Sequence, residues 1–131
     1  MPQLDAFGFV VDDMQRTLAF YRELGVPIPD DPTDGHVECT LPSGMRLMWD
    51  TADVITSFDT SWTRPVGSHR CALAFRCDSP GEVDTTYARV VARGFEGHLE
   101  PWDAFWGQRY ASLRDPDGNA VDLYAPLDGA R

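Results

Sequence analysis

The chain has 131 residues, a length typical of one domain that can bury its own core. Eleven basic residues against twenty-one acidic ones give a net charge of −10, which would repel phosphate backbones, so we expect no nucleic-acid partner. No apolar run reaches the about 20 residues that cross a bilayer, so we expect no membrane partner. The amino-terminal residues lack a signal-peptide pattern and the three cysteines form no CxxC pair, which predicts a cytoplasmic protein with reduced thiols.

The first half of the chain predicts a strand, a helix, a proline-containing edge segment and two strands joined by a turn, over residues 4–11, 14–24, 26–34, 36–41 and 45–50. Asp12 and Asp13 are suitable helix N-caps, and Gly25 is a suitable helix end. Three prolines in the edge segment favour an irregular or edge position there.

The second half repeats this order, with strands predicted over residues 71–77, 95–99, 108–114 and 120–124. Its helix should begin after Ser79, where Pro80 occupies the first helical position, and end at Gly94. FVVDD at 9–13 matches FRCDS at 75–79, and LPSGMRLMWD at 41–50 resembles DPDGNAVDLY at 115–124. We therefore predict one domain, 1–131, made of duplicated modules 1–50 and 69–127 with a linker over 51–68.

Alternation along these strands separates two faces. Large apolar residues of one parity should pack under the helices as the core: Phe7, Phe9, Val11, Leu47, Trp49, Leu73, Phe75, Val121 and Leu123. The opposite parity carries small and polar residues: Ala6, Gly8, His36, Glu38, Thr40, Met48, Ala72, Ala74, Gln108, Tyr110, Ser112, Asp122 and Tyr124. Such a face predicts an open concavity where a small molecule binds.

Three aromatic residues, Trp102, Phe105 and Trp106, fall in a predicted loop over 100–107. They could stack on a planar ligand, or they could close the end of the fold or pack a dimer interface, and the sequence favours neither. Phe58 and Trp62 in the linker are weaker candidates of the same kind. Arg109 beside the loop could hold a ligand carboxylate or pair with a surface acid.

The segments FVVDDMQRTLAFYRELG (9–25), ALAFRCDSPGEVDTTYARVVARG (72–94) and WGQRYASLRDPDGNAVDLY (106–124) resemble the vicinal-oxygen-chelate superfamily of glyoxalase I, extradiol dioxygenases and bleomycin-resistance proteins. The resemblance implies an α+β fold of two βαβββ modules that form a curved mixed sheet around a cleft. It also implies a homodimer.

Metal-using members of that superfamily place ligands at four strand positions, which correspond here to Ala6, Met48, Ala72 and Asp122. Alanine has no donor atom and a thioether is a poor ligand for hard divalent ions, so we expect no metal and no other cofactor. His36 and Glu38 share a strand face, but such a pair is more typical of a polar surface than of a ligand set.

These departures favour a metal-independent small-molecule-binding protein over an enzyme, with antibiotic sequestration as one form and an aromatic or cationic ligand. The predicted ligand-binding residues are His36, Glu38, Met48, Trp102, Phe105, Trp106, Tyr110, Asp122 and Tyr124. The alternative is a lyase, isomerase or dioxygenase-like enzyme that uses acid–base groups of the cleft, with Asp122 as the catalytic candidate, or an atypical metal site. A structural dimer with a vestigial cleft is a third hypothesis.

Overall fold

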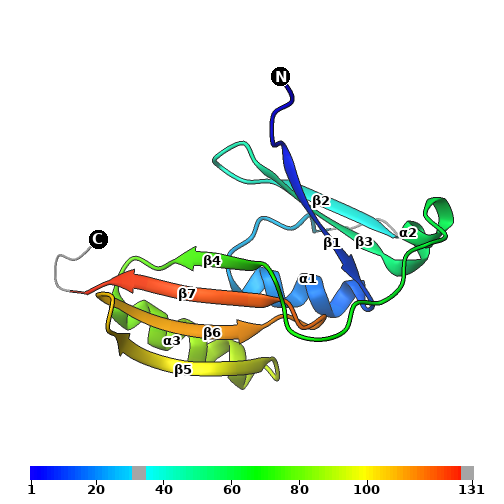
Figure 1. The fold of residues 1–131 in the computed structure, drawn as a ribbon. Coiled ribbons are helices and arrows are strands. Elements are labelled where there is room, and N and C mark those ends of the chain that lie inside the picture. Colours follow the sequence, from blue (N-terminus) through cyan, green and yellow to red (C-terminus); the bar gives the residue numbers. More distant parts are fainter. Residues whose placement is uncertain (31–34, 128–131) are drawn as a thin grey trace. The chain divides into compact units, whose positions relative to one another are not determined.

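A computed structural model of the chain describes residues 1–30 and 35–127 (Figure 1). It contains the helices and strands predicted from the sequence, except in the edge segment, and one further helix. The strands are β1 (Ala6–Val11), β2 (His36–Thr40), β3 (Arg46–Thr51), β4 (Ala72–Arg76), β5 (Glu96–Ala104), β6 (Gln108–Arg114) and β7 (Ala120–Pro126). The helices are α1 (Met14–Glu23), α2 (Ala52–Phe58) and α3 (Pro80–Ala92). Within the described residues, no helix is long and apolar enough to cross a membrane.

The chain divides into two compact units, Met1–Val66 and Gly67–Arg131. The boundary falls inside the predicted linker, 51–68, but the linker is not wholly irregular because it contains α2. The side chain of Thr51 accepts a hydrogen bond from the Val54 amide at 3.2 Å and so begins this helix. That the two units form a single domain around a cleft stays a prediction.

Unit 1 holds a three-stranded sheet in the order β1-β3-β2, with β1 parallel and β2 antiparallel to β3. Asp13 caps α1 by accepting a hydrogen bond from the Arg16 amide at 3.1 Å. The segment predicted to be irregular or an edge strand over 26–34 forms no strand in residues 26–30, and residues 31–34 lie outside the described residues. Pro27 and Pro29 cannot donate to a ladder, so the described part of the first module is βαββ rather than βαβββ.

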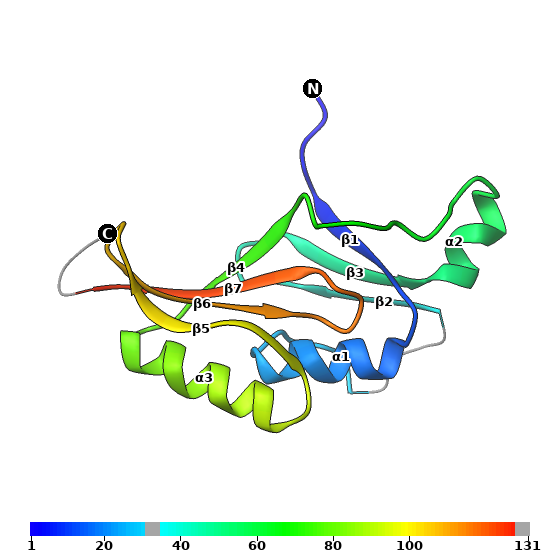
Figure 2. The same ribbon diagram turned by 60° about the horizontal axis from the view of Figure 1, so that its bottom comes forward.

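Unit 2 holds a four-stranded sheet in the order β4-β7-β6-β5, and α3 covers one face of it (Figure 2). Ser79 caps α3 by accepting from the Glu82 amide at 3.2 Å, and Pro80 occupies the first helical turn, as predicted. β5 continues five residues beyond the predicted end of that strand, through two irregularities in its pairing with β6. A Cβ at Gly97 in β5 would overlap the Tyr87 hydroxyl of α3, so a larger residue there would force the Tyr87 side chain to move.

The core follows the predicted parity at most positions. Six of the nine residues are buried: Phe9, Val11, Leu47, Trp49, Val121 and Leu123. Leu73 and Phe75 are half-buried, and Phe7, at 41% exposure, was wrongly placed in the core. Phe7 lies near the start of the edge strand β1, where its ring contacts Phe9 at a centroid distance of 5.0 Å but has solvent on the other side.

The duplication predicted from the sequence extends to strand register. Gly8 of β1 pairs with Met48 of β3, and Ala74 of β4 pairs with Asp122 of β7, both in parallel ladders. The two sequence matches align Gly8 with Ala74 and Met48 with Asp122. Equivalent strand positions therefore pair in the same register in both modules, although the side chains at those positions differ.

Candidate functional site

The open face of the unit 1 sheet brings together the three site residues predicted in the first module. The β2–β3 register places Glu38 beside Met48 and His36 beside Asp50, so all four side chains leave the same side of the sheet. His36 and Glu38 are exposed and Met48 is half-buried. Sequence reasoning missed Asp50, although its position two residues after Met48 puts it on the same face.

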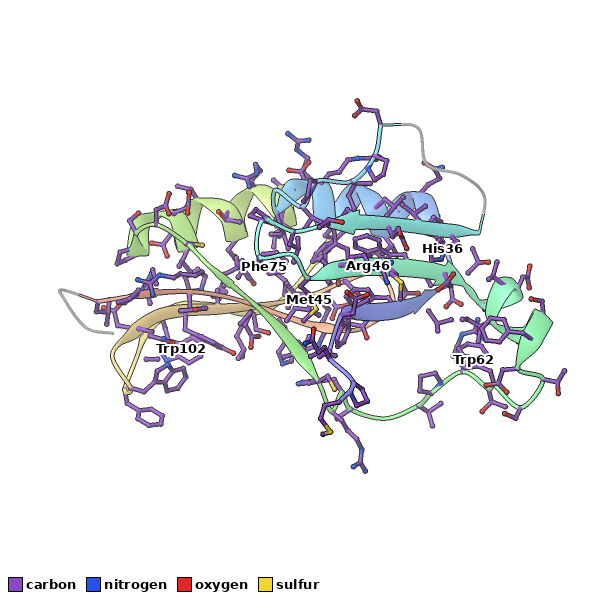
Figure 3. The ribbon with its side chains drawn as sticks, turned by 90° about the horizontal axis from the view of Figure 1, so that it is seen from above. His36, Met45, Arg46, Trp62, Phe75 and Trp102 are labelled. Atoms are coloured by element: carbon purple, nitrogen blue, oxygen red, sulfur yellow. The ribbon has the colours of Figure 1, made fainter. Side chains whose placement is uncertain are left out.

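A chain of charged groups runs along this face. The His36 ring lies between two carboxylates, with Nδ1 2.6 Å from Asp50 Oδ1 and Nε2 3.0 Å from Glu38 Oε2. Arg46 Nη1 donates to the same Glu38 oxygen at 3.0 Å, and Arg46 Nη2 donates to Asp5 at 2.7 Å. Figure 3 shows His36 and Arg46 on β2 and β3 of this sheet. The groups form one ion-pair network rather than a hollow lined by separate donors.

The network sets the charge of its members. The hydrogen bonds to Asp50 and Glu38 raise the pKa of His36, because both carboxylates stabilise the imidazolium. The hydrogen bond from His36 lowers the pKa of Glu38. A metal-binding histidine must offer a ring lone pair, and here both ring nitrogens already face carboxylates. The geometry agrees with a polar surface rather than a His–Glu ligand pair.

The open face of the unit 2 sheet carries an aromatic cluster, which we define as Trp102, Phe105, Trp106 and Tyr110. The Trp106 ring is central, with centroids 5.9 Å from Trp102, 5.0 Å from Phe105 and 5.2 Å from Tyr110. Trp102 and Tyr110 are paired across β5 and β6, and their rings are 5.1 Å apart. All four contacts are edge-to-face, the arrangement that aromatic quadrupoles favour.

The predicted loop position is wrong for Trp102, which lies on β5 where that strand approaches the turn into β6 (Figure 3). The turn holds only residues 105–107, and it exposes Phe105 to 95% and Trp106 to 46%. Trp106 is held in place by donating from Nε1 to Gln108 Oε1 at 2.7 Å. Sequence reasoning missed this role of Gln108, because the hydrogen bond depends on the exact length of the turn.

Asp122 and Tyr124 of β7 extend the same face. Tyr124 pairs with Tyr110, and Asp122 pairs with Ser112, which is buried. The Asp122 carboxylate lies diagonally across the β6–β7 ladder from Tyr110, on the same face of the sheet. Burial first, and then this carboxylate, raise the pKa of Tyr110, so the phenol stays protonated at neutral pH. The structure thus joins four of the six site residues predicted in unit 2 on strands, with Phe105 and Trp106 at the adjoining turn.

Arg109, Trp62 and Phe58 were weaker candidates for ligand contacts. Arg109 lies on the helix-covered side, where Nε donates to Asp84 of α3 at 2.8 Å and Nη1 donates to Asp103 at 3.1 Å. It therefore pairs with surface acids, the second of the two roles that the sequence left open. In unit 1, the Arg64 guanidinium lies 6.0 Å from the ring centre of Trp62. Phe58 is 73% exposed.

The family model of the Glyoxalase/Bleomycin resistance protein/Dioxygenase superfamily matches residues 3–123. The chain belongs to this superfamily. A crystal structure of a glyoxalase/bleomycin resistance protein/dioxygenase from Nocardioides is 25% identical with a TM-score of 0.78, over 100% of this chain and 87% of that one. No curated protein matches the chain.

Two further superfamily structures share the fold. A glyoxalase-related enzyme from Fulvimarina pelagi has a TM-score of 0.80 at 19% identity, over 95% of this chain and 88% of that one. A family enzyme from Burkholderia phytofirmans PsJN has a TM-score of 0.77 at 18% identity, over 96% of this chain and 100% of that one. The α+β architecture of a three-stranded and a four-stranded sheet is thus that of the superfamily.

The superfamily's metal positions can be tested against the side chains present. Ala6 and Ala72 offer no donor atom, and Met48 offers a thioether, which hard divalent ions bind poorly. Asp122 is a carboxylate, but it supplies only one of the three protein ligands that a catalytic ion normally has. Within residues 1–30 and 35–127, no group of three His, Cys, Asp or Glu side chains is arranged so that it could hold a metal ion. The residues at the four positions do not fit a catalytic metal.

Proposed function

We propose that this protein binds a small, partly planar molecule without a metal ion and releases it unchanged, as a protein that sequesters an antibiotic would. The observation that supports this most is the aromatic cluster on the open face of unit 2, with Asp122 next to Tyr110. Aromatic rings provide flat apolar area for a planar ligand. Sites for small molecules combine such walls with a few placed polar groups, here Asp122 and Gln108.

Two observations favour binding over acid–base catalysis. A general acid or base works best when its pKa lies near the operating pH. The pKa of Tyr110 is raised far from neutrality by burial and by Asp122. His36 is exposed and hydrogen-bonded to carboxylates at both ring nitrogens, so a substrate would have to displace one of them. A lyase, isomerase or dioxygenase-like activity therefore has less support from the geometry.

The test is a calorimetric titration of chelator-treated protein with three probes: bleomycin, the planar cation N-methylquinolinium, and its uncharged isostere 1-methylnaphthalene. We expect saturable binding of at least one probe that does not change when divalent metals are returned. Chromatography of the recovered probe should show it unconverted, and sedimentation should show the homodimer that the family resemblance implies. Saturation by none of the probes, binding only after metal is returned, or conversion of a probe would overturn the proposal.

A further inference from the structure

The Asp122 carboxylate lies on the open face of unit 2 without a cationic partner. No ion pair involves Asp122 within the described residues, and the β6–β7 register places Asp122 diagonally across from Tyr110 on the same face. The nearby Arg114 directs Nη1 to Ser112 Oγ at 3.3 Å and to the Leu113 carbonyl at 3.2 Å. By contrast, Arg46 and Arg109 each pair with two carboxylates. Asp122 is thus a half-buried carboxylate that forms no ion pair within the described residues.

The aromatic cluster lies along the strands from this carboxylate. Tyr110 contacts both indole rings with its own ring and lies diagonally across from Asp122. The pair Ser112–Asp122 and the pair Tyr110–Tyr124 are neighbouring pairs on this face, about 7 Å apart along the strands. The faces of aromatic rings attract cations through their quadrupoles, and a carboxylate at one end adds a full negative charge. Both parts of this surface favour the same sign of ligand charge.

We propose that this face of unit 2 selects planar cations, with the ligand ring against Trp102, Trp106 and Tyr110 and its positive group at Asp122; this inference rests on the proposed function. Anionic planar molecules are disfavoured, because Asp122 and the net charge of −10 repel them. The ligand class is an aromatic ring system that carries a quaternary or protonated nitrogen.

The experiment compares N-methylquinolinium with 1-methylnaphthalene, which have the same bicyclic shape and differ in a fixed charge. Calorimetric titrations at constant pH and low salt measure both dissociation constants on the full chain. We expect the cation to bind about tenfold more tightly than its uncharged isostere. The preference should shrink at high salt, because added ions screen a half-exposed charge.

Asp122→Asn keeps the shape of the side chain and removes its charge, so it should lower cation affinity about tenfold and leave 1-methylnaphthalene affinity unchanged. The matched control is Asp53→Asn, an exposed carboxylate on α2 of unit 1 whose loss changes the net charge equally, and it should keep the preference.

The outcomes separate the two proposals. If neither probe binds the wild-type protein, and bleomycin does not bind either, the proposed function fails. If both probes bind the wild-type protein with equal affinity, the binding function stands and the cation inference is wrong; this comparison needs no variant to fold. If Asp122→Asn leaves the cation preference intact, or Asp53→Asn removes it, the assignment of the charge to Asp122 is wrong.

Discussion

Trp106 is the residue whose removal should affect ligand binding most. Its ring contacts the other three members of the aromatic cluster, and its side chain is only half-exposed. Truncation of a fully buried Trp costs about 3–5 kcal/mol, so Trp106→Ala, at 46% exposure, should lower the free energy of unfolding by about 2 kcal/mol. The protein should therefore stay folded, which allows binding to be measured.

The effect of Trp106→Ala on binding follows from the loss of one stacking surface. Stacking of a planar ring on an aromatic side chain contributes about 1–3 kcal/mol, and about 1.4 kcal/mol corresponds to a tenfold change in dissociation constant. We expect the dissociation constant for N-methylquinolinium to rise at least about tenfold by isothermal titration calorimetry, at a temperature where unfolding curves show the variant fully folded.

The matched control is Trp62→Ala, which removes an indole whose ring faces Arg64 in unit 1 and is not a member of the aromatic cluster defined above. It should leave the dissociation constant within about twofold of the wild-type value, since a twofold change is well below 1 kcal/mol. An unchanged dissociation constant in Trp106→Ala would refute the ligand platform. An equal rise in both variants would show that the loss is not specific to the cluster.

Three further predictions concern the core, the charged network and the cysteines. Trp49 is fully buried and its Nε1 has no hydrogen-bond partner. Trp49→Phe removes this unsatisfied donor, which costs about 1–3 kcal/mol, but opens a cavity of similar cost. Urea denaturation should therefore show a change in the free energy of unfolding within about 1 kcal/mol, against a loss of about 3–5 kcal/mol for Trp49→Ala. The carboxylate contacts raise the pKa of His36 in the folded protein. Their contribution to stability is therefore complete when the pH is below the pKa of an unfolded-state histidine, about 6.5, and is lost as the pH rises through the pKa of the folded state. His36→Gln should therefore lower the free energy of unfolding at pH 5.5 but not at pH 9. The loss should be less than about 1 kcal/mol because the His36 side chain is 44% exposed. Equal losses at both pH values would contradict this prediction. A thiol reagent at pH 8 should label the exposed Cys71 and leave the buried Cys39 and Cys77 unlabelled. Burial also raises the pKa of Cys77 to about 11, which keeps its thiol protonated at this pH. Rapid labelling of all three cysteines in the native protein would contradict the burial of Cys39 and Cys77.

Local signals predicted most of the fold. Asp13 and Ser79 cap their helices as expected, because an N-cap acts through hydrogen bonds to amides two or three residues away. The duplicated sequence also predicted the equivalence of Met48 and Asp122, since the period of two along a strand converts sequence offset into sheet register. Polar and small side chains on one parity indicated the open faces of both sheets for the same reason.

Other features depended on distant neighbours. The length of β5 was underestimated because two irregularities let the strand continue past a proline, and these are set by pairing with β6. Trp102 was therefore assigned to a loop. The edge segment at 26–34 was ambiguous in sequence because its prolines permit either an edge strand or irregular chain, and residues 26–30 take the irregular form.

The sequence by itself determined which residues share a face, because alternation along a strand is a local geometric property. It therefore predicted that His36, Glu38, Tyr110 and Asp122 belong to the face opposite the helices. Only the tertiary structure decided what each of them contacts. His36 contacts Asp50 across the β2–β3 hairpin, and Tyr110 lies diagonally across the β6–β7 ladder from Asp122. Side-chain partners are set by interstrand register and rotamer, which residues far apart in the chain establish jointly.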